Sequence, residues 1–303
     1  MKIYNKTVHL EEGELENCFD SCPFCGSEKS RRIGTIQKSP LISALVCKNC
    51  HLGYADRQPT QKVLNEYYAN YYGISNRNTT IKKDLLIKHL SVHTIIGEEH
   101  EEFDILDFGG GDGSISYGLA QHILRTNKIK KINIYVIDPN FIKLENVNFN
   151  ITIHNLSSIE SIPANKKVDF VIASAILEHV KNPRETITQL FDVMKPSARF
   201  YARTPYIFPF KHLFNAIGIN LTMDFPGHLF DMGNKFWDSI LNTMNQEDDF
   251  QILISRTSLV ETSIKESFFG WLISHTFKLP SKILKKHYHF VGGWELFIKK
   301  KSV

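Results

Sequence analysis

The 303-residue sequence lacks any apolar run near the roughly 20 residues that a membrane-spanning helix needs. Its first residues, MKIYNKTVHLEEGE, contain no apolar segment typical of a secretory signal, so we expect a cytoplasmic protein. The sequence also lacks a strong charge of one sign, since it contains 36 Lys and Arg residues and 32 Asp and Glu residues. The resulting net charge of +4 does not by itself indicate nucleic-acid binding. The length and the 42% of apolar residues suit one large α/β domain with an appendage, or two modest domains.

Cysteine is absent from everything after residue 50. Four of the five cysteines form two C-x-x-C pairs, Cys22 with Cys25 and Cys47 with Cys50. Two such turns place four thiolates in a tetrahedron around Zn²⁺, whereas disulfides would need an oxidising compartment that nothing else in the sequence indicates. Four thiolates leave no open coordination position, so we predict structural rather than catalytic zinc. The remaining Cys18 either has no role or is a substitute ligand.

Residues 1–56 are therefore predicted to form a zinc ribbon. The segment between the two cysteine pairs predicts two short strands. Gly26 and Gly53, which follow the pairs, suit the tight turns of zinc knuckles. His51 is interpreted as a surface residue rather than a ligand. Because so small a unit cannot fold on its apolar core alone, the metal would supply much of its stability.

Residues 57–102 are predicted to form a helical linker or lid. Tyrosines recur there in adjacent pairs, so that Tyr68 and Tyr72 share one helical face, as do Tyr67 and Tyr71. These rings either pack between the ribbon and the main domain or form a lid that borders the ligand site. The next segment predicts an amphipathic helix. Its apolar face consists of Ile81, Leu85, Leu86 and Leu90.

From residue 103 to 303, short apolar strands alternate with helices, which predicts a parallel sheet with helices on both faces. One helix has a clear start, with Asn182 as N-cap, Pro183 at its first position and Glu185 at its third. Sheets of this kind bind ligands outside the carboxyl ends of their strands, beside the first strand. The segment ILDFGGGDGS, residues 105–114, lies at that place.

The glycine-rich segment does not match the common phosphate-binding patterns. A P-loop needs a lysine, and none follows Gly113. A dinucleotide fingerprint needs a glycine where Ser114 stands. The carboxylate of Asp107, just ahead of the glycines, would repel a pyrophosphate and suits a ligand that carries an ammonium and a sulfonium group. Asp138 ends the second strand, where a carboxylate can accept both ribose hydroxyls of a nucleoside.

The segments ILDFGGGDGS, YVID and LEHV, at their spacings, resemble the class I S-adenosylmethionine-dependent methyltransferases. The resemblance implies a Rossmann-like, seven-stranded sheet that is mostly parallel, with the last strand antiparallel. The cysteine pattern and the tyrosine-rich stretch resemble, more narrowly, bacterial methyltransferases of sugar and surface-polysaccharide pathways. Pro196-Ser197-Ala198 stands where that family commonly has P-G-G, and the chain lacks the extra C-terminal domain of the larger sugar C-methyltransferases. We therefore expect methyl transfer to a sugar or glycan hydroxyl.

The resemblance also assigns cofactor contacts. It places Asp107 near the ammonium group of S-adenosylmethionine and Asp138 on the ribose. The glycines that let the backbone approach the methionine part are Gly109, Gly110, Gly111 and Gly113. By position, Asn155 and Leu156 border the adenine, and Ser174 and Ala175 line the sulfonium side. For Leu156 and Ala175, plain core packing is the alternative.

Methyl transfer to a hydroxyl needs positioning of the acceptor and gains from a general base. His179 is the first candidate, with a structural histidine as the alternative. An aromatic and polar insertion at about 205–235 is expected to build the acceptor pocket, where His228 with Asp231 would form an oriented base. Ordinary surface chemistry is the alternative there. The other candidates in this insertion are Tyr206, His212 and Trp237.

A second insertion, at about 257–289, mixes aromatic residues with lysines. We expect a solvated capping helix; docking of a partner and contact with a membrane surface through the basic C-terminal region are the alternatives. Two other functions stay open. An RNA or protein methyltransferase would use the ribbon to hold its substrate, although the ribbon's basic cluster is small. A non-catalytic binding protein would not need so intact a cofactor loop.

Overall fold

The protein is described here by a computed structural model that covers residues 8–73, 83–94, 101–126, 128–139, 148–218, 224–258, 268–284 and 287–302. Ile81, the side chains of Tyr71 and Tyr72, and parts of both predicted insertions lie outside the described residues.

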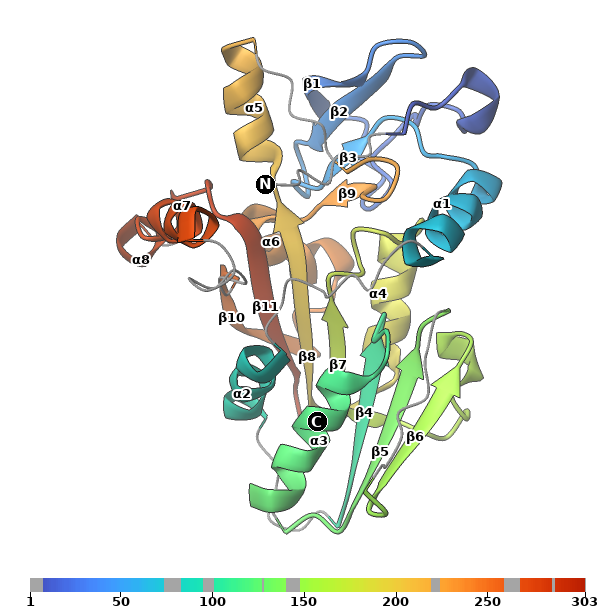
Figure 1. The fold of residues 1–303 in the computed structure, drawn as a ribbon, viewed down its shortest axis with the longest axis vertical. Coiled ribbons are helices and arrows are strands. Elements are labelled where there is room, and N and C mark those ends of the chain that lie inside the picture. The colour runs from blue at the N-terminus through green and yellow to red at the C-terminus, as the bar shows by residue number, and fades with distance from the viewer. Residues whose placement is uncertain are drawn as a thin grey trace.

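The N-terminal unit is a small antiparallel sheet. It follows a short 3₁₀ turn, η1 (Glu12–Glu14), and contains β1 (Ser30–Gln37), β2 (Ile42–Cys47) and β3 (Gly53–Ala55). The two strands expected between the cysteine pairs are thus confirmed. A fourth strand, β9 (Phe230–Asp231), joins the edge of this sheet beside β3 and comes from the predicted acceptor-pocket insertion (Figure 1). The ribbon and the main domain therefore share a sheet.

Two helices connect the ribbon to the main sheet. Helix α1 (Gln61–Gly73) lies beside the ribbon, and α2 (Lys83–His93) packs on α3 (Ser114–Thr126). Leu86 and Leu90 are buried as predicted, whereas Leu85 is 51% exposed, because it lies about 100° around the helix from Leu86.

The main sheet has seven strands in the order β10-β11-β8-β7-β4-β5-β6. The strands, in chain order, are β4 (Glu102–Phe108), β5 (Lys131–Ile137), β6 (Ile151–Leu156), β7 (Val168–Ser174), β8 (Met194–Tyr206), β10 (Phe250–Thr257) and β11 (Gly292–Lys300). Only β11 runs antiparallel to its neighbours β8 and β10, so the predicted mostly parallel sheet with an antiparallel last strand is confirmed. The carboxyl ends of the parallel strands point toward the ribbon and α1 (Figure 1).

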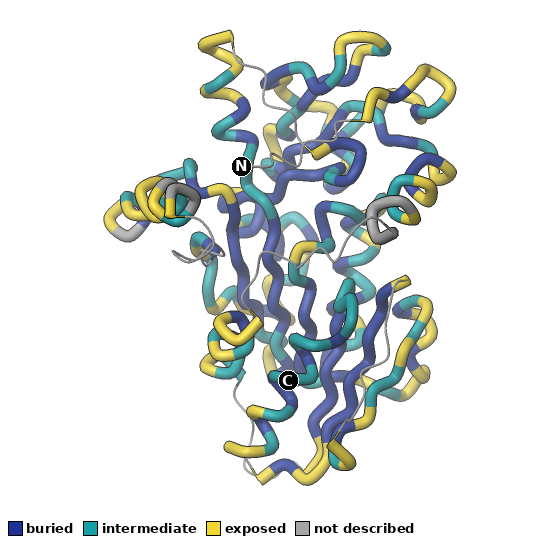
Figure 2. Tube along the Cα trace, viewed as in Figure 1, coloured by how far each residue is buried: buried dark blue, intermediate teal, exposed yellow. Residues whose placement is uncertain are grey.

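Apolar layers cover both faces of this sheet, whose inner strands are mostly buried, whereas the edge strands β6 and β10 are partly exposed (Figure 2). On one face lie α2 and α3. On the other face, α4 (Pro183–Asp192) and α6 (Asn234–Met244) share one continuous core with the ribbon. Asn182 precedes α4 as predicted, and Pro183 lies in the first helical turn. The side chain of Asn182, however, makes no cap hydrogen bond.

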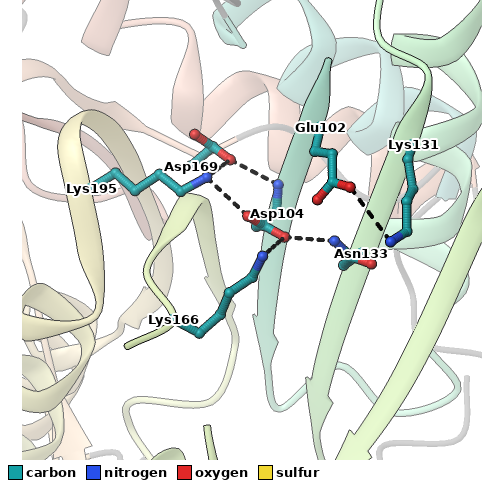
Figure 3. A network of polar contacts seen from close by, with 7 residues as sticks. All are labelled: Glu102, Asp104, Lys131, Asn133, Lys166, Asp169 and Lys195. Atoms are coloured by element: carbon teal, nitrogen blue, oxygen red, sulfur yellow. Dashed lines mark hydrogen bonds and ion pairs between the residues drawn. The ribbon is translucent and has the colours of Figure 1, made fainter. Parts of the chain in front are cut away.

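The amino ends of the central strands are joined by a buried ion network (Figure 3). Asp104, which is 1% exposed, accepts hydrogen bonds from Lys166 at 2.8 Å, from Lys195 at 2.9 Å and from Asn133 at 2.9 Å. Lys195 also bridges to Asp169 at 2.7 Å. Because this network lies at the edge opposite to the strand ends that carry the glycine loop, it stabilises the sheet rather than the site.

The remaining helices lie at the periphery. Helix α5 (Phe208–Ala216) stands beside β1, and α7 (Phe268–Lys278) with α8 (Ser281–Leu284) projects beside β11 (Figure 1). The helix expected in the second insertion is therefore present. Exposed apolar side chains include Leu272 on α7 and Ile283 and Leu284 on α8. Among the described residues, no helix is long and apolar enough to cross a membrane, and contact with a membrane surface stays a prediction.

Candidate functional site

The glycine-rich loop between β4 and α3 is fixed against the end of β5. Gly109, Gly111 and Gly113 have φ angles of 73°, 57° and 70°, in the left-handed region that favours glycine. The Gly109 N–H donates to the Ile137 carbonyl oxygen at 2.8 Å, and the Gly111 N–H donates to Oδ2 of Asp138 at 2.9 Å. The loop and the Asp138 carboxylate are thus held together at the carboxyl edge of the sheet.

Asp107 lies next to this loop and is 3% exposed. Burial raises the pKa of its carboxyl to about 6, against a hydrogen bond from Ser116 that lowers it, and the charge of Asp138 raises it further. A Cβ on Gly110 would lie 2.5 Å from Cγ of Asp107, so this position has no room for a side chain. Oδ2 of Asp107 has no hydrogen-bond partner among the described residues, which leaves the carboxylate capacity for a cationic ligand.

The segment after β7 approaches the same loop. A Cβ on Gly109 would lie 2.4 Å from Cγ1 of Ile176. Ala175 has a φ of 58°, unusual for alanine, and its N–H donates to the Arg203 carbonyl oxygen at 2.8 Å. Because Ala175 is exposed, the core-packing alternative is wrong for this residue. The Ser174 hydroxyl oxygen is buried and has no hydrogen-bond partner in the described part of the chain.

The end of β6 carries the two residues predicted to border the adenine. Asn155 is exposed and Leu156 is half-buried. Leu156 also packs against the main apolar core, so core packing accounts for part of its side chain. Their contact with a ligand stays a prediction.

The chemistry of this site fits S-adenosylmethionine. Two carboxylates, Asp107 and Asp138, suit an ammonium group and a ribose diol and would repel a pyrophosphate. Two buried oxygens without partners, on Asp107 and Ser174, are available for hydrogen bonds to a ligand.

A second polar cluster lies just after β7, around His179. The Nδ1 atom of His179 is 2.8 Å from the carbonyl oxygen of Gly227. The Tyr68 hydroxyl donates to the same carbonyl oxygen at 3.0 Å and lies 3.1 Å from Nδ1. A carbonyl oxygen only accepts, so Nδ1 of His179 carries a proton, and in the neutral imidazole Nε2 is the basic nitrogen. Tyr68 of α1 contacts His179 and also packs against the core that the ribbon shares with the main domain, as the packing interpretation expects. The lid stays a prediction, and the side chain of Tyr72 lies outside the described residues.

His228 and Glu178 complete this cluster. The rings of His179 and His228 meet edge-on with centroids 4.8 Å apart. Burial, and then the charge of His179, lowers the pKa of His228 to about 3, so its ring is neutral at physiological pH. Glu178 is 2% exposed, its Oε1 lies 3.8 Å from Nε2 of His179, and burial raises its pKa. No sequence signal predicts that the side chain of Glu178 lies beside the two histidines.

The predicted His228–Asp231 pair is wrong. The two carboxylate oxygens of Asp231 accept hydrogen bonds from the backbone N–H groups of Ile207 and Phe208, at 2.6 and 3.2 Å, where α5 begins. Burial raises the pKa of Asp231 to about 7. Asp231 therefore anchors a helix start, and the ring that faces His228 belongs to His179.

Three further candidates of the first insertion lie away from the His179 cluster. Tyr206 packs its ring against Gly233, and its hydroxyl lies 3.3 Å from Nδ1 of His289. Trp237 is fully buried and donates to the Thr204 hydroxyl at 2.9 Å. His212 is exposed on α5. None of these contacts brings them to the His179 cluster.

A cleft of about 430 Å³ opens beside His179, between α1, the 3₁₀ turn η2 (Ile159–Ser161) and α4. Its lining is mostly polar. The lining residues are Gln61, Leu64, Tyr68, Glu160, His179, Val180, Lys181, Asn182, Glu185, Thr186 and Gln189. No sequence pattern predicts this cleft, because its walls come from segments that are far apart in the chain.

The four paired cysteines lie together in the ribbon, with every Sγ within 4.8 Å of the others. Cys22 and Cys50 are 3.6 Å apart at Sγ, as are Cys25 and Cys47. Tetrahedral zinc with Zn–S bonds near 2.3 Å requires sulfurs about 3.8 Å apart, so the cluster is compatible with a structural zinc site. Cys18 is exposed and lies outside this cluster.

The turns of the two knuckles differ from expectation. Gly26 follows the first pair with a φ of 71°, as predicted. In the second knuckle His51, not Gly53, takes the left-handed conformation, with a φ of 59°. Gly53 lies in β3, where its missing side chain makes room for Phe208 and Asp231.

A family model described as "Methyltransferase domain" matches residues 80–252, which is more than half of the chain. The chain belongs to this methyltransferase family. With its glycine loop and acidic residues in place, it is a class I S-adenosylmethionine-dependent methyltransferase, as the sequence predicts. The match includes the cofactor loop, the His179 segment and the first insertion.

The methyltransferase is similar to several known proteins at low identity. It is 28% identical over 127 residues to a ubiquinone biosynthesis O-methyltransferase of Rickettsia akari, and the match covers 42% of this chain and 49% of that protein. It is 26% identical over 257 residues to the probable polyketide synthase 8/35 of Dictyostelium discoideum, over 71% of this chain and 10% of that protein. This chain thus spans half or less of the curated relatives it matches.

Solved structures with a similar fold include the plantazolicin methyltransferase BpumL in complex with S-adenosylhomocysteine. Its TM-score is 0.47 at 13% identity, over 80% of this chain and 91% of that one. A methyltransferase of Bacillus halodurans has a TM-score of 0.46 at 13% identity, over 72% and 99% of the two chains.

Proposed function

We propose that this methyltransferase transfers a methyl group to a hydroxyl group of a sugar or glycan acceptor in polysaccharide biosynthesis. The observation that carries the proposal is the cleft beside His179, because amide, carboxylate and ammonium groups such as those of Gln61, Glu160 and Lys181 dominate its lining. Such groups can exchange or share their partners within the chain with the many hydroxyls of a sugar, and they give the cleft a polar rather than an apolar surface.

S-adenosylmethionine supplies a methyl group that its sulfonium already activates. The chain would hold it through Asp107 at the ammonium group and Asp138 at the ribose hydroxyls. Gly109 and Gly111 leave the backbone open to the methionine part. Ser174 and Ala175 would border the sulfonium, and Asn155 and Leu156 the adenine.

His179 is the group that would promote loss of the acceptor's hydroxyl proton. Its Nδ1–H is held by Gly227, so the lone pair on Nε2 is the basic position. Tyr68 donates to the same carbonyl oxygen and so fixes that segment beside His179. The ribbon would have a structural role, with zinc held by the four clustered cysteines.

The acceptor class is tested with methyl-labelled S-adenosylmethionine and four pools: nucleotide sugars, polysaccharide fragments, catechol-type quinols and transfer RNA. We expect label in a sugar-containing pool only, and a loss of about a hundredfold or more in His179→Gln, since a positioned proton acceptor typically contributes that much. The matched control is His122→Gln, an exposed histidine on α3. Label confined to the quinol or RNA pool would overturn the sugar acceptor.

A further inference from the structure

Three metal-ligating side chains meet beside the acceptor cleft. One ligand atom each from Glu178, His179 and His228 lies within 4.8 Å of the other two. Two of them are adjacent in the chain after β7, and the third comes from the first insertion. The Leu229 N–H donates to the Glu178 carbonyl oxygen at 2.8 Å, and this bond holds the two segments together.

The hydrogen bonds around this cluster suit metal binding. Nδ1 of His179 donates to the Gly227 carbonyl oxygen at 2.8 Å, so in the neutral imidazole the free nitrogen is Nε2, which lies 3.8 Å from Oε1 of Glu178. Metal-bound histidines typically donate their other ring N–H to such a carbonyl. Oε2 of Glu178 is buried and has no hydrogen-bond partner among the described residues. A buried carboxylate oxygen without a partner is costly unless a ligand satisfies it.

The charges around the cluster favour a cation. The carboxylate of Asp224 interacts with His179, and that of Asp231 with Glu178. The guanidinium of Arg203 is the opposing charge near Glu178. Asp224 and Glu178 thus place two acidic side chains beside His179, and Arg203 places a guanidinium near Glu178.

We propose that Glu178, His179 and His228 bind a divalent transition-metal ion at the wall of the acceptor cleft. Two imidazoles and one carboxylate favour ions such as Mn²⁺, Fe²⁺, Co²⁺ or Zn²⁺ over Mg²⁺ or Ca²⁺, which prefer oxygen ligands. Metal–ligand bonds of about 2.0–2.2 Å require the three atoms to move closer together than they lie now. His179 is 24% exposed at its side chain and lines the cleft, so the ion would be reachable from it.

The use of the ion rests on the proposed transfer to a hydroxyl group. Three protein ligands leave open positions, and an acceptor hydroxyl bound there would lose its proton at lower pH because the cation stabilises the alkoxide. His179 would then promote deprotonation through the ion, with its Nε2 as a ligand. The oxygen attacks the methyl carbon, the carbon–sulfur bond breaks with its electron pair on sulfur, and the hydroxyl proton leaves to solvent.

The site is tested with Mn²⁺ on zinc-loaded protein, because Mn²⁺ does not compete for a four-cysteine zinc site. The paramagnetic resonance signal of free Mn²⁺ disappears when the ion binds. We expect one Mn²⁺ site per chain, and at least about tenfold weaker binding in His228→Gln and in His179→Gln. Glu178→Gln is a third variant with nearly the same volume. The matched control is His122→Gln, which should titrate like the unaltered protein.

Binding of S-adenosylmethionine by calorimetry shows that each variant is folded. Equal Mn²⁺ affinity in the unaltered protein, His179→Gln and His228→Gln, or no saturable site in the unaltered protein, would overturn the metal site. If the titration shows no Mn²⁺ site but the protein still methylates a sugar, the proposed function stands and the metal site is refuted. Conversely, a Mn²⁺ site in a protein that labels no sugar confirms the site and refutes the acceptor.

Discussion

Gly53 of the ribbon pairs with Asp231 of the catalytic domain so closely that a Cβ on Gly53 would lie 2.9 Å from the Cβ of Asp231. The same Cβ would lie 2.7 Å from the ring of Phe208. The Asp231 carboxylate in turn accepts hydrogen bonds from the backbone N–H groups of Ile207 and Phe208, where α5 begins. The missing side chain of Gly53 thus allows the ribbon to pack closely against the insertion that carries His228.

Gly53→Ala is therefore expected to destabilise the protein by about 1–3 kcal/mol, because the added methyl group overpacks a buried contact. Chemical denaturation followed by tryptophan fluorescence measures the change. Gly13→Ala is the control, since a Cβ there meets nothing within 4 Å and should alter stability by less than about 0.5 kcal/mol. Equal stability of Gly53→Ala and Gly13→Ala would mean that the ribbon does not need this close contact.

The ion network at the amino ends of the strands gives a second prediction. Burial alone would raise the pKa of Asp104, but hydrogen bonds from Lys166, Lys195 and Asn133 hold it below the usual value. A lowered pKa stabilises the fold above the unfolded-state pKa, and this stability is lost as the pH falls through the folded-state pKa. Asp104→Ala should lower the free energy of unfolding by about 3 kcal/mol at neutral pH. This is the low end for a broken buried ion pair, because both lysines are partly exposed.

The partner control for this network is Glu102→Gln. Glu102 pairs with Lys131 at 3.5 Å, and both side chains are about half exposed, so the pair contributes within about 1 kcal/mol. S-adenosylmethionine affinity should be unchanged in both variants because the network lies at the opposite edge of the sheet. A stability loss in Glu102→Gln as large as that in Asp104→Ala would contradict the assignment.

Much of this architecture is readable from local sequence signals. Glycines next to Asp107, an acidic residue at Asp138 and alternating strands and helices suffice to place the cofactor loop and the sheet. The acceptor side was less predictable. His228 and Asp231 are three residues apart and were expected to pair, but one faces His179 and the other caps α5. Contacts between segments far apart in the chain, such as Tyr68 with Gly227, leave no periodic signal that a sequence pattern could reveal.

The knuckles show how tertiary packing overrides a local rule. The glycine of the second knuckle was expected to make its turn, yet His51 takes the left-handed conformation and Gly53 is used for close packing. Glycine signals a need for space or for an unusual φ, and the sequence alone does not distinguish the two.

The predicted four-cysteine zinc site gives a third prediction. If the four cysteines hold zinc, the purified protein contains one tightly bound zinc per chain, and Cys47→Ser lowers that content and the midpoint of thermal unfolding. Because the ribbon shares its core and its sheet with the catalytic domain, stability of the whole chain should fall, not that of the ribbon alone. Cys18→Ser is the control, since Cys18 is exposed and outside the cluster. Zinc content that is unchanged in Cys47→Ser would refute the four-cysteine site.

Asp107 predicts how cofactor binding depends on pH. Without the cofactor its pKa is raised to about 6 by burial, and then by the charges of Asp138 and Asp112, although Ser116 opposes the shift. The ammonium group of S-adenosylmethionine favours the ionised carboxyl, so binding below pH 6 must first remove a proton. Affinity should therefore be constant above about pH 7 and fall toward tenfold per pH unit below pH 6. Asp107→Asn should bind weakly and lose this slope, whereas Asp112→Asn, which removes a half-exposed neighbour, should keep it. Calorimetry between pH 5 and pH 8 measures both, and a slope that survives in Asp107→Asn would show that another group titrates.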